Sequence, residues 1–131
     1  MTLFINTASY DEIVLTLLSS DDEKIKTKKI KAARQQAEKL LPAVAKLLES
    51  QNKKLKDLAK IQVVVSGGSF TSLRIGVVTA NALAYALNIS IEAVTASGEI
   101  LKNQATKKFA NYNIVTPQYD REPSIGIKKK K

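Results

Sequence analysis

The segment 61–65 constrains the fold of this chain more than any other part of the sequence. It reads IQVVV, a compact run rich in β-branched residues, and such runs are typical of a strand buried on both faces of a sheet. A helical pattern stands on each side of it, because apolar residues recur at three- and four-residue steps over 37–48 and again over 71–87. A buried strand between two helices predicts parallel crossovers and therefore an α/β fold.

Three strand-like runs precede the first helix. Thr2–Asn6 is apolar, and residues 12–20 form a second apolar run that ends at a polar turn. Two such runs joined by a short polar segment predict an antiparallel hairpin. Residues 24–30 then alternate lysines with Ile25 and Thr27, which predicts a strand with one wet face whose lysines discourage edge-to-edge pairing.

The rest of the chain completes the expected order. Asn88 is expected to end the second helix, residues 89–95 to form the last strand, and residues 99–110 a shorter helix. The order βββαβαβα predicts a single ribonuclease-H-like (actin-like ATPase) domain over 1–115. Its mixed sheet carries the helices 37–48 and 71–87 beside each other on one side. Residues 116–131 contain two prolines and four lysines, and are expected to be an extended basic tail.

Composition excludes several kinds of chemistry. The 131-residue chain has no cysteine and no histidine, so zinc catalysis and the usual nucleophile–base pairs lack their side chains. The carboxylates of residues 21–23 cluster in a turn, where a solvated loop or helix cap is the ordinary role. An actin-like ATPase needs an acidic residue and glycines near the first hairpin, but residues 6–9 read NTAS. We therefore expect no catalytic residue, no metal and no cofactor.

The segments also bear on location. The N-terminus lacks the basic start and long apolar run of a secretion signal. The apolar stretch 77–87 is expected to be too short to span a bilayer. A soluble, cytoplasmic protein is therefore expected, and the absence of cysteine fits a reducing compartment.

The net charge of +9, with a pI near 9.8, attracts phosphate backbones. Two explanations stay open, because lysines also keep small domains soluble and no aromatic residues are interleaved with them. The candidate RNA contacts are Lys39, Lys46, Lys128, Lys129, Lys130 and Lys131.

A glycine pair follows the buried strand, in the segment SGGSFTSLRIG at 66–76. Glycines in such a turn can cradle a phosphate, permit a tight turn, or let another chain come close. The segment lacks the lysine of a Walker loop and the spacing of a dinucleotide fingerprint.

The helix that follows is apolar nearly all round. One sector suits the sheet, and a second sector contains Ile75, Val78 and Ala82, with Thr79 beside them. A helix of this kind is expected to be covered on more than one side, and a domain this small offers little cover beyond its other helix. The pattern therefore predicts a partner protein.

These residues also carry a family resemblance. SGGSFTSLRIG is similar to the GPGSFTGLRIG signature of the bacterial TsaB family, QAEKLLPAV at 36–44 resembles its HSExLLPxI helix, and PQYDREP at 117–123 resembles its PxYxRxP motif. The chain departs from the signature at Ser66, Gly67 and Ser72. It also has Gln36 for the usual histidine and Asn6 for the aspartate of the superfamily, and most of the family's second lobe has no counterpart.

The resemblance implies a non-catalytic subunit of the machinery that makes threonylcarbamoyladenosine in tRNA, paired with the TsaD transferase through the two helices. A TsaE-like ATPase, tRNA and a second copy of the chain are further candidate partners. The expected interface is Leu41, Val44, Ile75, Val78, Thr79, Ala82 and Ala86. The signature turn is Gly67, Gly68, Ser69, Phe70, Thr71, Leu73 and Arg74, with Phe70 and Leu73 expected to anchor the helix start. The alternative is a basic RNA-binding or scaffold module of the actin-like fold without enzymatic activity.

Overall fold

The computed structural model describes residues 1–101, 107–109 and 112–116 of the chain. A five-stranded mixed sheet forms its centre, with the strand order β3-β2-β1-β4-β5. The first three strands, β1 (Thr2–Asn6), β2 (Glu12–Leu18) and β3 (Lys24–Lys31), form an antiparallel meander. The other two, β4 (Lys60–Val64) and β5 (Ser90–Val94), run parallel to β1. The predicted mixed sheet with a hairpin start is confirmed.

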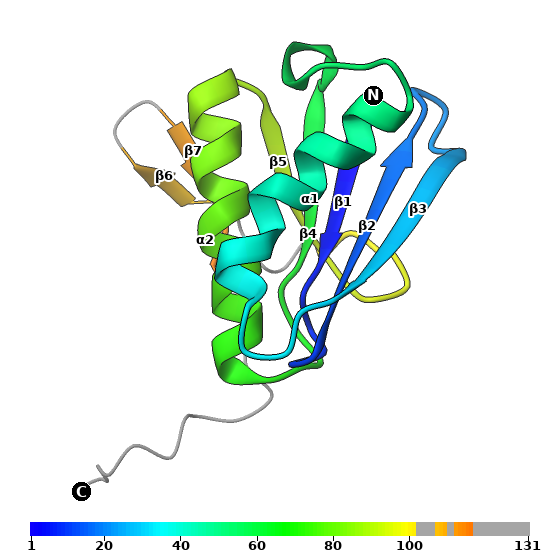
Figure 1. The fold of residues 1–131 in the computed structure, drawn as a ribbon. Helices are drawn as coiled ribbons and strands as arrows, with labels where there is room; N and C mark the ends of the chain where they lie inside the picture. The colour runs from blue at the N-terminus through cyan, green and yellow to red at the C-terminus, as the bar shows by residue number, and fades with distance from the viewer. Residues whose placement is uncertain (102–106, 110–111, 117–131) are drawn as a thin grey trace, which may run out of the picture.

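Both long helices lie on one side of this sheet, as the sequence pattern predicted (Figure 1). Helix α1 (Gln36–Ser50) packs against β2 and β3, and α2 (Phe70–Leu87) packs against β4, β1 and β5. The two helices also contact each other. A single turn of 3₁₀ helix, η1 (Leu55–Asp57), leads from α1 into β4.

The core lies between this helix layer and the sheet. Its largest fully buried side chains come from alternate positions of β1, β2 and β4, among them Leu3, Ile5 and Ile61. From the helices, Leu40, Leu47 and Leu73 close the layer. Apolar burial of this kind is the main stabilising contribution to such a domain.

The ends of α2 follow local chemistry. The Ser69 side chain caps the helix by accepting from the Ser72 N–H at 3.1 Å. Asn88 ends the helix in the left-handed region, with φ 55°, so the predicted helix end is confirmed. In α1 the helix continues through Pro42. Glu38 and Pro42 are both exposed, so the carbonyl that loses its helical donor belongs to the solvent side.

The predicted helix over 99–110 is wrong. The segment after β5 turns back instead, because Thr95 N–H donates to the Glu99 carbonyl and Leu101 N–H donates to the Ala93 carbonyl. Further on, β6 (Lys107–Phe109) pairs with β7 (Tyr112–Ile114) as a two-stranded sheet. A strand partner therefore replaces the expected local hydrogen bonding. The predicted tail lies outside the described residues, except for Thr116 at its start.

The expectation that the second helix is too short to span a membrane needs a correction. The stretch 77–87 is short, but the whole helix is long and apolar enough to cross a membrane by length and composition alone. The core helix of a globular domain meets the same criterion, and the contacts of α2 with β4, β1, β5 and β7 are of that kind.

Candidate functional site

The signature turn packs against the turn between β1 and β2 (residues 7–11). A Cβ added at Gly68 would collide with the backbone and side chain of Ala8. The Ser69 N–H donates to the Ala8 carbonyl at 3.1 Å. Gly67 has φ +82°, a conformation that favours glycine. Of the uses open to this glycine pair, the structure shows the tight turn, and the residue that comes close to Gly68 is Ala8 of the same chain.

The third glycine of the signature has a similar role. A Cβ at Gly76 would collide with the hydroxyl oxygen of Thr7. Thr7 is fully buried, and its hydroxyl donates to the Ser72 carbonyl at 2.6 Å. The first turns of α2 therefore rest directly on the β1–β2 turn.

Gln36 holds the same turn from the opposite side. Its side chain is 4% exposed, and its Nε2 donates to the Ser9 carbonyl at 2.6 Å and to the Glu12 carbonyl at 3.1 Å. Asn6 Oδ1 accepts from the Ala8 N–H at 2.9 Å. Sequence reasoning noted Gln36 and Asn6 only as departures from a family pattern. The hydrogen bonds from Gln36 to this turn connect segments that are distant in the sequence, so they could not be predicted from local pattern.

The consequence is chemical. Around the first hairpin, where an actin-like enzyme manages phosphate and metal, this chain places its own hydrogen-bonded side chains. No group of three acidic side chains close enough to hold a metal ion occurs among the described residues. The turn therefore acts as a structural joint between β1, α1 and α2.

A second feature is the outer surface of the two helices. Leu41 is 51% exposed and Val78 is 59% exposed, and Ala82 and Ala86 are exposed as well. We call these four residues the outer helix patch. Ile75 and Thr79, predicted with them, are half-buried.

One predicted interface residue belongs to the core instead. Val44 is 1% exposed, so its assignment to an open contact surface is wrong. It shares the sheet-facing side of α1 with Leu40 and Leu47, whereas Leu41 is one helical step of about 100° away from Leu40.

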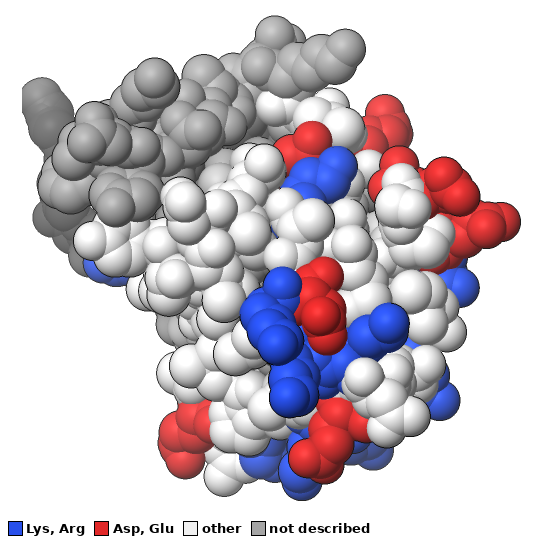
Figure 2. Space-filling view, turned by 90° about the horizontal axis from the view of Figure 1, so that it is seen from above, with Lys and Arg blue, Asp and Glu red and all other residues white. Residues whose placement is uncertain are grey.

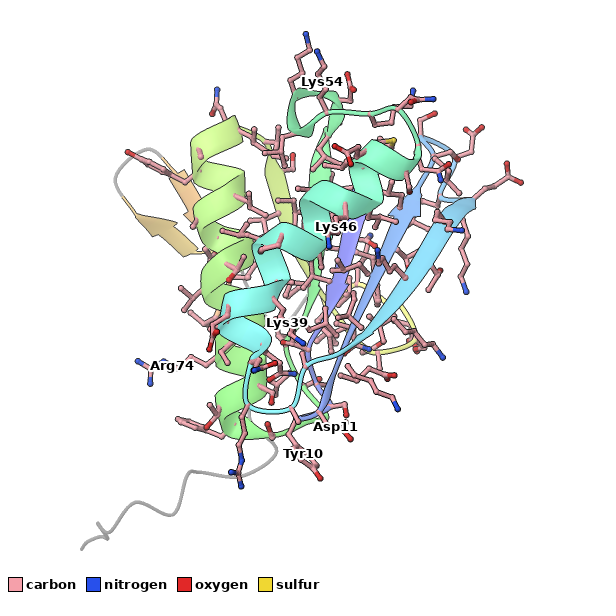
Figure 3. All side chains as sticks on the ribbon, viewed as in Figure 1. Tyr10, Asp11, Lys39, Lys46, Lys54 and Arg74 are labelled. Atoms are coloured by element: carbon pink, nitrogen blue, oxygen red, sulfur yellow. The ribbon has the colours of Figure 1, made fainter. Side chains whose placement is uncertain are left out.

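The signature residues at the start of α2 divide in the same way. Leu73 is fully buried, as expected of a residue that anchors the helix start, and Phe70 is half-buried. Thr71 and Arg74 are exposed, and Arg74 points away from the body of the molecule (Figure 3).

The flank of α2 beside β7 is held by a residue that sequence reasoning did not single out for this role. Asn81 Nδ2 donates to the Val115 carbonyl at 2.8 Å, and the Val115 N–H donates to Asn81 Oδ1 at 2.9 Å. A polar residue within an apolar helix was the available signal, but its partner lies 34 residues away. This contact covers part of the α2 circumference from within the chain.

The predicted basic residues of α1 lie on its other flank. Lys39 Nζ donates to the Lys31 carbonyl of β3 at 3.3 Å. Figure 3 places Lys39 and Lys46 on the side of α1 away from α2. The lysines at 128–131 lie outside the described residues.

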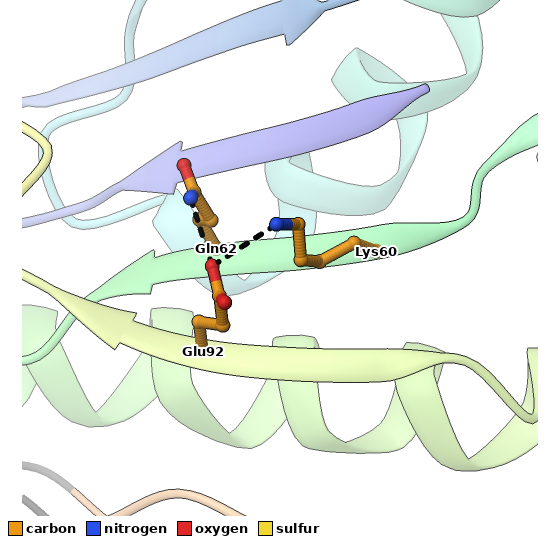
Figure 4. A network of polar contacts seen from close by, with 3 residues as sticks. All are labelled: Lys60, Gln62 and Glu92. Carbon is orange, nitrogen blue, oxygen red and sulfur yellow. Dashed lines mark hydrogen bonds and ion pairs between the residues drawn. The ribbon is translucent and has the colours of Figure 1, made fainter. Parts of the chain in front are cut away.

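The sheet face opposite the helices carries a cavity of about 480 Å³. Phe4, Val14 and Leu18 form apolar parts of its wall, and the turn after β5 closes one side of it. Nearby, Glu92 accepts from Gln62 Nε2 at 2.9 Å and pairs with Lys60 at 3.4 Å (Figure 4). These polar groups pair with one another across β4 and β5, so their role is to stabilise the sheet.

Comparison with known proteins agrees with this architecture. Residues 24–115 match the family described as TsaD: tRNA N6-adenosine threonylcarbamoyltransferase. The chain is 41% identical, over 63 residues, to the tRNA threonylcarbamoyladenosine biosynthesis protein TsaB of Bacillus subtilis (strain 168). That similarity covers 48% of this chain and 28% of the relative.

Two solved structures share the fold. YeaZ from Pseudomonas aeruginosa matches with a TM-score of 0.65 and 26% identity, over 72% of this chain and 43% of that chain. A second solved structure, described as an uncharacterized protein with similarity to peptidase YEAZ from Pseudomonas aeruginosa, matches with the same TM-score and identity over 72% of this chain and 42% of that chain. The chain therefore spans less than half the length of each of these relatives. It belongs to the TsaD family and is a TsaB/YeaZ-like protein with an actin-like α/β fold.

Proposed function

We propose that this chain is a non-catalytic subunit in the synthesis of threonylcarbamoyladenosine in tRNA, and that it docks onto a TsaD-like transferase through the outer helix patch. The observation that carries the proposal is the exposure of Leu41 and Val78 on neighbouring helices. Apolar side chains gathered on the surface of a small domain commonly mark a protein interface. The name of the Bacillus subtilis relative supplies the pathway.

The chemistry around the first hairpin supports a role without catalysis. The Ala8 carbonyl accepts from Ser69, and the Gln36 amide occupies the Ser9 and Glu12 carbonyls. The chain contains no histidine and no cysteine for acid–base or nucleophilic work. Its contribution to the pathway is therefore to position or stabilise a catalytic partner, in the cytoplasm where tRNA is modified.

The small side chains of the outer helix patch favour close docking by a partner helix. Ala82 and Ala86 are exposed on α2 and lie one turn apart, so a partner backbone can approach there without displacing a large side chain. A second copy of the chain would occupy the same patch and compete with the transferase. A TsaE-like ATPase would instead add to the pair.

Ala82→Glu tests the docking site. The substitution places a charge in the proposed contact and is expected to weaken association by about 2–5 kcal/mol, while the isolated variant keeps its thermal melt. The transferase from the same organism is co-expressed, and its co-purification with the chain at fixed stoichiometry is measured.

Ala96→Glu is the matched control, because Ala96 is exposed in the turn after β5 and lines the cavity on the other face of the sheet. It should leave the association intact. Equal co-purification of the transferase with the Ala82 variant and the parent would overturn the proposed docking site. Turnover of ATP or RNA by the purified chain, removed by a change in the signature turn, would overturn the non-catalytic role.

A further inference from the structure

The edge strand β3 is unusually basic. Its eight residues read KIKTKKIK, which is five lysines with no acidic side chain. The sheet order places β3 at the edge, next to β2 alone. Lys26 is exposed and Lys28 is half-buried, so the stem of Lys28 packs while its charged end remains close to solvent.

The pairing register places two of these lysines on the helix side of the sheet. Lys26 lies opposite Leu17 and Lys28 lies opposite Leu15. Both leucines are fully buried in the core beneath the helices. Directly opposed residues of an antiparallel pair point to the same face, so both lysines project toward α1.

Helix α1 adds two more lysines to the same side. Lys39 reaches the Lys31 carbonyl of β3, and Lys46 follows it by two helical turns on the same stripe. We call Lys26, Lys28, Lys39 and Lys46 the basic edge. Figure 2, seen from above, shows Lys and Arg side chains near the middle and along the lower edge of this face, with acidic side chains among them and at its right-hand side, while the left-hand side is mainly white.

These charges are not neutralised by neighbouring side chains. Within the described residues, Lys60–Glu92 is the only ion pair within 4 Å, and it involves no member of the basic edge. Glu49 lies one turn beyond Lys46, and Glu12 lies opposite Lys31 in the register. Neither carboxylate forms an ion pair with these lysines. Crowded like charges are unfavourable in the free protein, and a polyanion would relieve that repulsion.

Edge protection alone explains only part of this pattern. Lysines on an edge strand hinder pairing with other sheets, which accounts for the lysines of β3. It does not account for Lys39 and Lys46 on the neighbouring helix. A surface made from a strand and a helix flank of the same sign has the form of a binding site for a polyanion.

We propose that the basic edge binds the phosphate backbone of RNA. Lys26 and Lys28 are alternate residues of the strand, so they stand about 6.6 Å apart on one face, where both can reach the same phosphate backbone. No aromatic side chain of β3 or α1 accompanies them, so the contact reads phosphates rather than bases and is independent of sequence. An anionic membrane would need apolar side chains beside the lysines, and Ile25 is the only exposed apolar residue of β3.

The proposal rests on the proposed function in that the RNA would be the tRNA offered to the partner. Helix α1 separates the two surfaces, with Leu41 in the outer helix patch and Lys39 and Lys46 on the opposite flank. RNA on the basic edge would leave the docking surface for the transferase open.

The test measures binding of a labelled, unmodified tRNA transcript to the full chain, from about 50 mM salt upward. Lys26→Gln with Lys28→Gln should reduce the affinity roughly tenfold and make the negative slope of log K against log salt less steep by about two. Lys26→Arg with Lys28→Arg should restore both. The matched control is Lys53→Gln with Lys56→Gln, since both lysines are exposed in the segment after α1, and it should retain most of the affinity.

Four results would overturn the proposal: unchanged binding by the glutamine pair, equal loss in the control pair, loss only on removal of residues 128–131, or tighter binding to polyglutamate or phosphatidylserine vesicles than to tRNA. A thermal melt of each variant verifies that it is folded. If the glutamine pair does not fold, the arginine pair decides the test, because it must bind tRNA as the parent does. Failure of the proposed function is separable, because Ala82→Glu should bind tRNA normally and the lysine variants should still co-purify with the transferase.

Discussion

Asn81 and Val115 exchange two hydrogen bonds, so the Asn81 side chain pairs with the Val115 backbone as a neighbouring strand would. Val115 is 1% exposed and belongs to the main core. An amide on the flank of α2 thus ties the segment after β7 to the domain. The join also limits how much of α2 remains open to a partner.

Replacement of Asn81 by alanine should destabilise the fold. Both polar groups of the Val115 backbone would lose their partners, which costs about 1–3 kcal/mol when such groups are buried. Urea unfolding followed by circular dichroism measures the change. Thr71→Ala, at an exposed position of the same helix, should change the stability by less than about 0.5 kcal/mol. An Asn81 variant as stable as the parent would mean that the pairing contributes nothing.

Gly76 and Thr7 provide a second test. Gly76→Ala places a methyl group against the buried Thr7 hydroxyl and should cost about 1–3 kcal/mol by overpacking. Thr7→Ala removes the obstructing atoms at the cost of its hydrogen bond to Ser72. In a double-mutant cycle, the double variant should therefore be more stable than the sum of the single changes predicts. Additive effects would show that the two residues do not interfere.

Gln36 offers a third. Gln36→Leu leaves the Ser9 and Glu12 carbonyls without the amide that they share, and we expect a loss of about 1–3 kcal/mol in the free energy of unfolding. Gln35→Leu is the matched control, because Gln35 is exposed and its side chain makes no capping hydrogen bond. Equal effects of the two changes would contradict a specific role for Gln36. Chemical denaturation of both variants gives the comparison.

The fold was largely predictable because its elements carry strong local periodicity. The alternation of lysines in β3 and the apolar run of β4 each determine an element without reference to distant residues. The region after β5 was mispredicted for the opposite reason. Its turn back onto β5 depends on hydrogen bonds to Ala93 and between Thr95 and Glu99, and local pattern does not report such pairing.

The site was less predictable than the fold. Periodicity identifies the apolar side of α1 but does not show where the sheet stops covering it. Leu41 and Val44 were therefore both predicted to lie at the interface, although Leu41 is 51% and Val44 is 1% exposed. The glycines of the signature were recognisable, but their contacts with Ala8 and Thr7 bridge segments that are far apart in the chain. Side chains that join distant turns become visible only when the strands are placed.

The same pair of residues on α1 separates core from contact surface. Val44→Ala removes methyl groups from a buried site and should lower the free energy of unfolding by about 1–3 kcal/mol, with little change in transferase binding once folding is allowed for. Leu41→Ala should do the reverse. The free energy of unfolding should stay within about 0.5 kcal/mol of the parent value, and association should weaken because an exposed anchor of the outer helix patch is lost. Thermal melts and co-purification with the transferase, measured side by side, give both quantities.

A Leu41 variant that binds the transferase as the parent does would remove α1 from the contact and confine it to Val78, Ala82 and Ala86 on α2. A Leu41 variant that unfolds early would mean that Leu41 belongs to the core despite its exposure.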